Sequence, residues 1–167
     1  MNRIWKLTLV IVAIVLIDQF SKLYIQSQMY VGESHSVISG FFSITYVRNP
    51  GAAFGLLAQA PDVIRKPLFL LLPLVASFWL AYLIWTSRKQ YLLMSTIYSL
   101  ILAGAVGNLI DRFYLGYVVD FIDFYIGTTH FPAFNVADSS ITVGGILLVV
   151  DLLLQLKNPN KNASDPH

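Results

Sequence analysis

The sequence contains no cysteine and few charged residues. Without cysteine the chain has no disulfide framework, no thiolate nucleophile and no cysteine-ligated zinc or iron–sulfur site. Charged residues make up 12% of the 167 residues, about half the ~25% of an average soluble domain. Hydrophobic residues make up 56%, and the mean hydropathy is +0.66. This composition argues against a soluble globule and favours a membrane protein.

The sequence also lacks a basic stripe, internal repeats and low-complexity tracts. Its 11 basic residues are spread over the whole chain, and the net charge is only +2. Such a distribution does not match a phosphate backbone, so nucleic acid is not an expected partner. The length fits one domain, which we place at residues 1–156 as a single polytopic membrane domain. The polar segment 157–167 is predicted to be a disordered cytoplasmic tail.

Apolar stretches long enough to cross a hydrocarbon core, which takes about 20 helical residues, occur along the whole chain. They are 4–25, 68–85, 91–110 and 136–156. The first stretch also resembles a secretory signal peptide, but no A-x-A cleavage site follows it. Asp18, Gln19 and Lys22 instead continue its helical pattern, so we predict a retained first helix.

The third stretch is rich in small residues, among them Gly104 and Gly107. Small residues let another helix backbone approach closely. We therefore predict that the third span is the packing centre of the bundle.

The distribution of basic residues predicts the orientation in the membrane. An even number of spans places both termini on one side. The short segments on that side hold most of the basic residues: Arg3, Lys6, Arg88, Lys89, Lys157 and Lys161. The positive-inside rule then places the termini in the cytoplasm and the loops 26–67 and 111–135 outside.

The first outer loop contains a strand pattern. Residues 41–47 are rich in β-branched and aromatic side chains and run into Asn49, Pro50 and Gly51, which favour a turn. The predicted fold is an all-α membrane protein with four transmembrane helices and a small periplasmic β-containing region.

Most of the acidic residues map to the outer ends of the spans or to the outer loop between the last two spans. These are Asp18, Asp111, Asp120, Asp123 and Asp138. An acidic side chain at membrane depth has an unfavourable free energy, so each of these residues is a candidate for a functional role. Asn108, Asp111 and Arg112 share one helical face at spacing i, i+3, i+4. Asn135 and Asp138 lie at the start of the fourth span, so we expect these two polar faces to converge.

Simpler structural roles remain open for several of these residues. Asp18 and Lys22 form an i, i+4 pair, which stabilises a helix by ~0.2–0.5 kcal/mol without any chemistry. Asp111 and Arg112 are consistent with an ion pair at the membrane interface, because ion pairing is the usual way in which charge is tolerated at this depth.

The remaining polar candidates also have structural explanations. Asn135 fits a helix N-cap, with Asp138 as the acid of the first turn, where the helix dipole favours negative charge. His35 and His130 lie in outer loops without partners at metal-binding spacing, so we expect them to be solvated.

Asp120 is the residue that favours a catalytic interpretation. It lies in an alternating, aromatic-rich segment, 116–125, with no cation nearby in the sequence. If Asp120 lies beside Asp138, ionisation of both carboxyl groups is unfavourable because their negative charges repel. The two groups then share one proton. Such a dyad deprotonates a water for attack on a carbonyl while its protonated member donates to the carbonyl oxygen. On a strand, Asp123 would face away from Asp120 because side chains alternate.

Five short segments, in order along the chain, resemble the motifs of the lipoprotein signal peptidase family, signal peptidase II. They are 18–22 (DQFSK), 48–54 (RNPGAAF), 107–112 (GNLIDR), 118–121 (VVDF) and 134–139 (FNVADS). The resemblance implies a membrane aspartic endopeptidase of the bacterial inner membrane. Its implied substrates are prolipoproteins carrying diacylglycerol on the lipobox cysteine, and it cuts the bond just before that cysteine.

The resemblance also implies roles for individual residues. Asp120 and Asp138 match the catalytic pair, and Asp123 matches neither catalytic position. The positions that support the site or contact substrate are matched by Asp18, Asn49, Asn108, Asp111, Arg112 and Asn135. We expect no metal and no cofactor, the substrate and membrane lipid as partners, and a monomer.

Three other classes of protein would use some of the same features. A proton-coupled transporter buries acids, but near the membrane midplane and usually with an internal repeat. A metal-dependent lipid phosphotransferase needs carboxylates spaced to share one cation, with bases for the phosphates. A non-catalytic membrane scaffold needs none of these residues.

Overall fold

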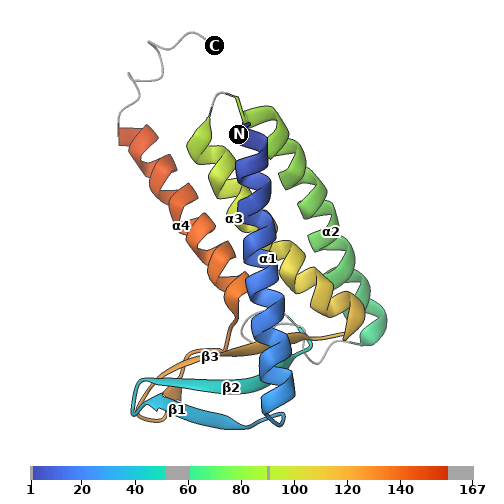
Figure 1. Ribbon diagram of the computed structural model, residues 1–167, viewed down its shortest axis with the longest axis vertical. Coiled ribbons are helices and arrows are strands. Elements are labelled where there is room, and N and C mark those ends of the chain that lie inside the picture. Colours follow the sequence, from blue (N-terminus) through green and yellow to red (C-terminus); the bar gives the residue numbers. More distant parts are fainter. Residues whose placement is uncertain (1, 52–60, 90, 158–167) are drawn as a thin grey trace.

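The computed structural model describes residues 2–51, 61–89 and 91–157. Four long helices form a bundle, and a small sheet covers the end of the bundle opposite the chain termini (Figure 1). The helices are α1 (Arg3–Gln28), α2 (Asp62–Ser87), α3 (Leu92–Tyr114) and α4 (Val136–Lys157). The strands are β1 (Ser34–Ile38), β2 (Phe42–Asn49), β3 (Val118–Ile126) and β4 (Thr129–His130).

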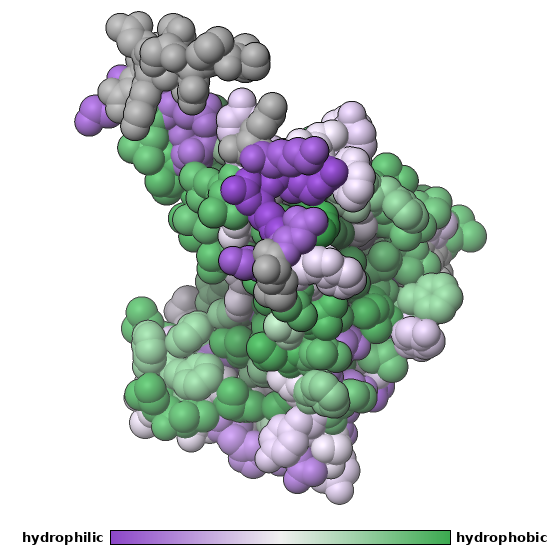
Figure 2. Space-filling view, turned by 45° about the horizontal axis from the view of Figure 1, so that its top comes forward, coloured by the Kyte–Doolittle hydropathy of each residue, from purple (hydrophilic) through white to green (hydrophobic). Residues whose placement is uncertain are grey.

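The four helices are the predicted membrane spans. Each is long and apolar enough to cross a membrane, with the candidate span of α2 running over Pro67–Ser87. Apolar side chains dominate the visible surface of the bundle, and hydrophilic side chains gather at the end where the termini lie (Figure 2). α2 begins earlier than predicted, at Asp62, and α3 ends later, at Tyr114. Polar residues continue α2 at its start and α3 at its end, so hydropathy alone underestimates the lengths of these two helices.

Two predicted segments lie partly outside the described residues. The segment 158–167 of the predicted tail is not described, and Lys157, its first residue, is the last residue of α4. Residues 52–54 of the second motif are also outside the described part of the chain.

The sheet is antiparallel, with strand order β1-β2-β3-β4. The predicted strand at 41–47 is confirmed as β2, which continues to Asn49. β2 and β3 pair so that Val47 is opposite Asp120 and Asn49 is opposite Val118. This register brings the end of β2 beside the start of β3, where the polar residues of both motifs lie.

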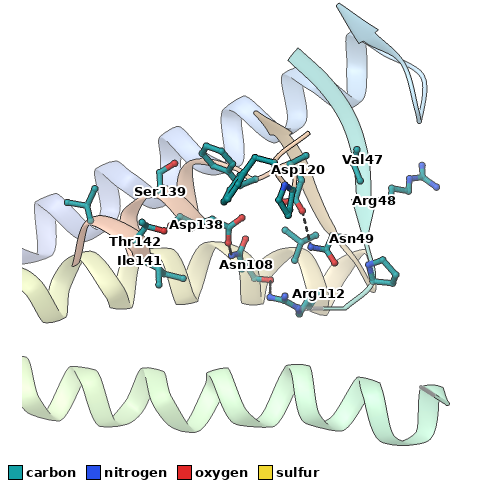
Figure 3. Close-up of a pocket in the computed structure, with 17 residues that line it drawn as sticks. Val47, Arg48, Asn49, Asn108, Arg112, Asp120, Asp138, Ser139, Ile141 and Thr142 are labelled. Atoms are coloured by element: carbon teal, nitrogen blue, oxygen red, sulfur yellow. Dashed lines mark hydrogen bonds between the residues drawn. The ribbon is translucent and has the colours of Figure 1, made fainter. Parts of the chain in front are cut away.

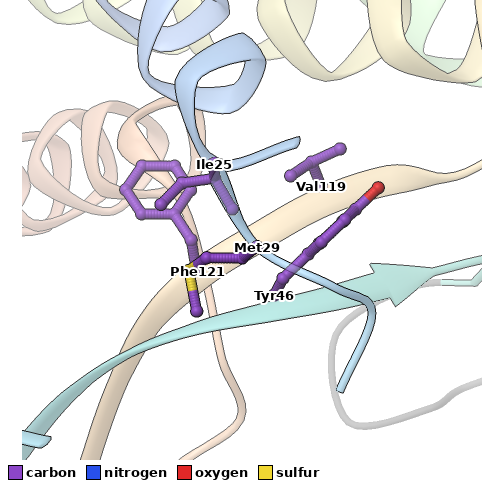
Figure 4. Close-up of a cluster of buried hydrophobic side chains, with 5 residues drawn as sticks. All are labelled: Ile25, Met29, Tyr46, Val119 and Phe121. Carbon is purple, nitrogen blue, oxygen red and sulfur yellow. The ribbon is translucent and has the colours of Figure 1, made fainter. Parts of the chain in front are cut away.

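A small apolar core joins the sheet to the bundle. The end of α1 supplies Ile25 to this cluster, the adjoining Met29 packs beside it, and the strands supply Tyr46, Val119 and Phe121 (Figure 4). Burial of these side chains fixes the sheet against α1. The outer ends of the helices and the strands therefore hold a defined relative position.

α3 is the packing centre of the bundle, as the small residues predicted. In the apolar 18-residue stretch that represents the span of α3, 44% of the residues are buried, against 11% in the corresponding stretch of each other helix. A Cβ atom on Gly104 would overlap the Ala137 carbonyl oxygen and lie 2.6 Å from Cγ1 of Ile141. A Cβ atom on Gly144 would lie 2.7 Å from Cγ1 of Ile101. Glycine on both helices therefore allows α3 and α4 to approach closely.

Candidate active site

A cavity of about 1030 Å³ opens where α3, α4, β2 and β3 meet. Polar side chains from all four elements converge on it (Figure 3). Those labelled in the figure include Asn49, Asn108, Arg112, Asp120 and Asp138. The predicted convergence of the polar ends of the third and fourth spans is confirmed, and Asp120 joins them.

Asp120 is buried on β3, with 2% of its surface exposed. Its Oδ1 accepts a hydrogen bond from Nδ2 of Asn135 at 2.7 Å, and its Oδ2 accepts one from Nδ2 of Asn49 at 3.0 Å. Burial and, next, the charge of Asp138 raise the pKa of Asp120 to about 7, although the two amide hydrogen bonds act in the opposite direction. Near neutral pH this carboxyl group can therefore hold a proton.

Asp138 lies in the first turn of α4 and forms a reciprocal cap with Asn135. The Asp138 backbone N–H donates to Oδ1 of Asn135 at 2.9 Å, and the Asn135 backbone N–H donates to Oδ2 of Asp138 at 3.3 Å. This arrangement is a capping box, which satisfies backbone donors that a helix start leaves free. The N-cap interpretation is therefore correct, and the same two residues also belong to the cavity site.

Two asparagines connect the carboxyl groups of Asp120 and Asp138. Asn108 donates from Nδ2 to Oδ1 of Asp138 at 2.7 Å. Asn135, which donates to Asp120, also lies with Nδ2 3.2 Å from Oδ1 of Asn108. The hydrogen-bond chain Asp120, Asn135, Asn108, Asp138 therefore fixes both acids in one site.

Asp18, Lys22 and Asp111 form a buried ion cluster behind this chain. Lys22 Nζ lies 2.8 Å from Oδ2 of Asp18 and 3.0 Å from Oδ2 of Asp111, and all three side chains are at most 3% exposed. Asp18 accepts the backbone N–H of Ala137 at 2.9 Å, and Asp111 accepts that of Val119 at 3.1 Å. The cluster therefore ties α1 and α3 to the segments that carry the two catalytic candidates.

Two structural explanations for charged residues need correction. The i, i+4 pair of Asp18 and Lys22 forms, but it is buried and extends to Asp111, so it is more than a local helix contact. The prediction of an ion pair between Asp111 and Arg112 is wrong, because within the described residues Asp111 pairs with Lys22 instead. The guanidinium of Arg112 instead donates to the backbone carbonyl oxygens of Asn108 and Gly51.

Lys22 and Gln19 also belong to the site, although neither was predicted as a site residue from the sequence. Nε2 of Gln19 donates to Oδ1 of Asp111 at 2.9 Å and to the Gly107 carbonyl oxygen at 3.1 Å. Both residues belong to the first motif, and a cation within an apolar helix requires a partner. Asp18, in the same motif, already meets that requirement, so nothing local in the sequence indicates the further contacts with Asp111.

Arg112 lines the cavity from the end of α3. Its Nη2 donates to the Gly51 carbonyl oxygen at 3.2 Å and its Nη1 to the Asn108 carbonyl oxygen at 3.4 Å. Its Nε is buried and has no hydrogen-bond partner among the residues that the structure describes. Arg112 therefore braces the turn after β2 against α3.

Asp123 takes no part in the cavity. Its carboxylate lies 2.9 Å from Nδ1 of His130, and it does not line the cavity that holds Asp120. The expectation that Asp123 faces away from Asp120 is confirmed. His130 is 55% exposed, but its contact with Asp123 corrects the expectation of a purely solvated ring. His35 is likewise exposed and lies 2.9 Å from a carboxylate oxygen of Glu33.

Apolar residues between β4 and α4 form one wall of the cavity. They are Phe131, Pro132, Ala133 and Phe134. The backbone of Phe134 exchanges hydrogen bonds with that of Ile122 at 2.8 and 3.0 Å, which holds this segment against β3. The sequence motif indicated only Phe134, because this segment has no strand pattern of its own.

Comparison with known proteins identifies close relatives over most of the chain. Residues 10–154 match the family described as Signal peptidase (SPase) II. The lipoprotein signal peptidase of Syntrophus aciditrophicus (strain SB) is 47% identical over 144 residues, which cover 86% of this chain and 89% of the relative. The lipoprotein signal peptidase of Desulforapulum autotrophicum is 43% identical over 148 residues, covering 89% of this chain and 91% of the relative.

A solved structure has the same fold. It is described as a bacterial membrane enzyme structure obtained by the in meso method at 2.3 Å resolution. It superposes with a TM-score of 0.82 at 37% sequence identity, covering 99% of this chain and 96% of that chain.

Proposed function

The chain belongs to the signal peptidase II family, the aspartic peptidases that cleave signal peptides from prolipoproteins, and we propose that Asp120 and Asp138 are its catalytic pair. The observation that carries this assignment is geometric. Both carboxyl groups line one cavity and are connected through Asn135 and Asn108. Asn49, Asn108 and Asn135 donate directly to the pair, whereas Asp18, Asp111 and Arg112 support the surrounding backbone.

In the proposed reaction the pair begins with one proton, held by Asp120. Asp138 removes a proton from a water molecule as the water oxygen attacks the peptide carbonyl carbon, and Asp120 donates its proton to the carbonyl oxygen. The product of this step is a tetrahedral diol. Asp138 then delivers its proton to the amide nitrogen, the C–N bond breaks, and Asp120 recovers a proton from a diol hydroxyl. The pair returns to its singly protonated state.

The surroundings of Asp120 support its role as the acid. A pKa of about 7 allows it to hold a proton at neutral pH, and burial is the main cause of that value. Asp138 lies at the start of α4, where the helix dipole favours a negative charge. The two acids therefore have environments that suit opposite roles.

We propose that the substrate is a prolipoprotein whose cysteine already carries diacylglycerol, and that the bond before this cysteine is cut. Two acyl chains anchor such a cysteine at the membrane surface. The cavity lies at the end of the helices beside apolar lining residues such as Phe131, Ile141 and Val143. A lipidated cysteine therefore reaches the site without leaving the lipid.

We propose that the site lies at the periplasmic side of the bacterial inner membrane, with both termini in the cytoplasm. Arg3, Arg88 and Lys89 gather at the terminal end of the bundle, where Arg3 donates to the carbonyl oxygens of Arg88 at 2.8 Å and Lys89 at 3.1 Å. Basic residues favour the cytoplasmic side. Since one chain supplies every described group of the site, we propose that a monomer is sufficient.

The decisive experiment presents the purified protein with a lipidated and an unlipidated prolipoprotein and measures product masses. We expect cleavage before the cysteine of the lipidated form only. Cleavage of both forms would contradict the proposed substrate. Loss of cleavage in EDTA would favour a metal enzyme, and proton-coupled flux in vesicles without cleavage would favour a transporter.

A further inference from the structure

Lys22 is a buried cation that the proposed reaction does not use. Its side chain is 1% exposed, and Asp18 and Asp111 lie within 3.0 Å of Nζ. A third partner is the neutral side chain of Asn108, whose Oδ1 accepts a hydrogen bond from Nζ at 3.1 Å. Two carboxylates already satisfy the need of a buried ammonium for counter-charge. The contact with Asn108 therefore has another consequence.

That consequence is the orientation of the Asn108 amide. An ammonium group only donates hydrogen bonds, so Asn108 must present its oxygen to Lys22. The Nδ2 group of Asn108 is thereby turned toward Asp138, to which it donates at 2.7 Å. Asn135 reinforces this orientation, because its Nδ2 lies 3.2 Å from the same Asn108 oxygen. Lys22 thus sets the direction of the hydrogen bond that ends on Asp138.

We propose that Lys22 is a positioning residue that acts through Asn108 to hold Asp138 as the carboxylate and leave the shared proton on Asp120. This inference rests on the proposed catalytic pair. A donor polarised by a neighbouring cation binds an ionised acceptor more strongly than a neutral one. The backbone N–H of Asn135 adds a second donor to Asp138. Since only one of two facing carboxylates ionises cheaply, the proton stays on Asp120.

The other charged groups near the pair act on it without a hydrogen bond to the Asn108 side chain, and among them the charge of Arg112 also favours an ionised Asp138. Asp18 on α1 and Asp111 on α3 are within 3.0 Å of Lys22 and partly offset its charge. Arg112 on α3 donates to backbone carbonyl oxygens, and Arg48 on β2 donates from Nε to the Tyr46 hydroxyl. In the described part of the chain, Lys22 is the cation that donates to the side chain of Asn108, and this side chain in turn donates to Asp138.

The test measures the pH dependence of kcat on a lipidated prolipoprotein peptide. The acid limb of this profile reports formation of the Asp138 carboxylate in the enzyme–substrate complex. In Lys22→Met, we expect that limb to move to higher pH by roughly one unit, with kcat roughly tenfold lower below the limb. Lys22→Arg, which retains charge and donors, moves the limb back toward the wild-type position.

A second variant separates this effect from loss of folding. Asn108→Leu has a similar shape and leaves the ion pairs of Lys22 in place, but it cannot donate to Asp138. We expect the same upward movement of the acid limb, and no further movement in the double variant with Lys22→Met. If Lys22→Met does not fold, the position of the acid limb in Asn108→Leu alone decides whether the inference holds.

Two results would overturn the inference. One is an acid limb that stays in place in Asn108→Leu, or in a folded Lys22→Met, while kcat falls equally at every pH. The other is full additivity of the two shifts. Failure of the catalytic assignment has a different signature, because Asp120→Asn or Asp138→Asn would then retain activity.

Discussion

Asp120 and Asp123 lie three residues apart on β3 but have different surroundings. Asp120 contacts two asparagine amides in the cavity, whereas Asp123 contacts the exposed ring of His130. We expect Asp120→Asn and Asp138→Asn each to reduce turnover by about 10²- to 10⁴-fold or more, because an amide neither takes nor shares the proton. Asp123→Asn, the matched control, retains most activity. An inactive Asp123→Asn beside an active Asp120→Asn would contradict the assignment.

The pKa of Asp120 predicts the alkaline side of the pH profile. Because this pKa is raised to about 7, the proton needed for catalysis is present below that pH and is lost above it. We therefore expect kcat/KM, which reports the free enzyme, to fall as pH rises through about 7. Turnover of a lipidated peptide, measured in EDTA from pH 4 to 10, checks this limb. A rate that increases continuously to pH 10 would instead indicate attack by hydroxide.

The same raised pKa has an effect on stability. An unfolded aspartate has a pKa of ~3.9, so between that value and about 7 the folded chain holds a proton that the unfolded chain has released. This contribution to stability is present in full below ~3.9 and is lost as pH rises through the folded-state value. At pH 8, ionisation of the buried Asp120 lowers the free energy of unfolding, and Asp120→Asn removes this effect. Each kcal/mol that is regained should raise Tm by roughly 2–4 °C. Thermal unfolding in detergent measures this, and a lower Tm at pH 8 would contradict it.

The sequence predicts individual residues well where the relevant partner is local. Asn135 and Asp138 are three residues apart, and the capping box follows from that spacing. Lys22 is different: Asp18 at i−4 already explains its charge, and nothing nearby in the sequence indicates Asp111 and Asn108. Contacts between helices depend on how the helices pack, which local periodicity does not encode.

At the level of elements, the contact between α3 and α4 depends on two glycines. A Cβ atom added at Gly104 would overlap the Ala137 carbonyl oxygen and crowd Cγ1 of Ile141, so it would force the helices apart. We expect Gly104→Ala to destabilise the protein by about 1–3 kcal/mol. Gly145→Ala is the matched control, because a Cβ atom there meets no atom of the described residues within 4 Å. Helix propensity favours alanine by about 1 kcal/mol, so Gly145→Ala should be neutral or stabilising.

Unfolding of both variants in detergent tests this contrast. Equal stability of Gly104→Ala and Gly145→Ala would show that α3 and α4 can separate without loss. Activity of Gly104→Ala should also fall, because Ala137 precedes Asp138 and moves with α4.

Hydropathy and strand patterns predicted the elements but not all of their partners. The four helices and β2 follow from apolar runs and from β-branched and aromatic residues. The pairing of β3 with the short strand β4 was not predicted, although it brings His130 near Asp123. β4 has two residues, too few for any periodic pattern to emerge.

For the whole molecule, orientation in the membrane is the property that the site most depends on. Lys89 is exposed in the connection after α2, and Ser36 is exposed on β1 at the opposite end of the molecule. Because the chain has no native cysteine, Lys89→Cys and Ser36→Cys each provide a unique label site. With an impermeant reagent on intact spheroplasts, we expect labelling at 36 and not at 89. The reverse pattern would place the cavity at the cytoplasmic side.

The ion cluster of Asp18, Lys22 and Asp111 also constrains biogenesis. α1 leaves the ribosome with a carboxylate and an ammonium inside an apolar helix, whereas Asp111 is synthesised about ninety residues later. Two charged side chains in a lone membrane helix are unfavourable even as an i, i+4 pair, so we expect α1 to reach its full stability in the bilayer only when α3 arrives. A nascent chain released before α3 therefore holds the pair of Asp18 and Lys22 without the contacts from Asp111 and Asn108 that complete it.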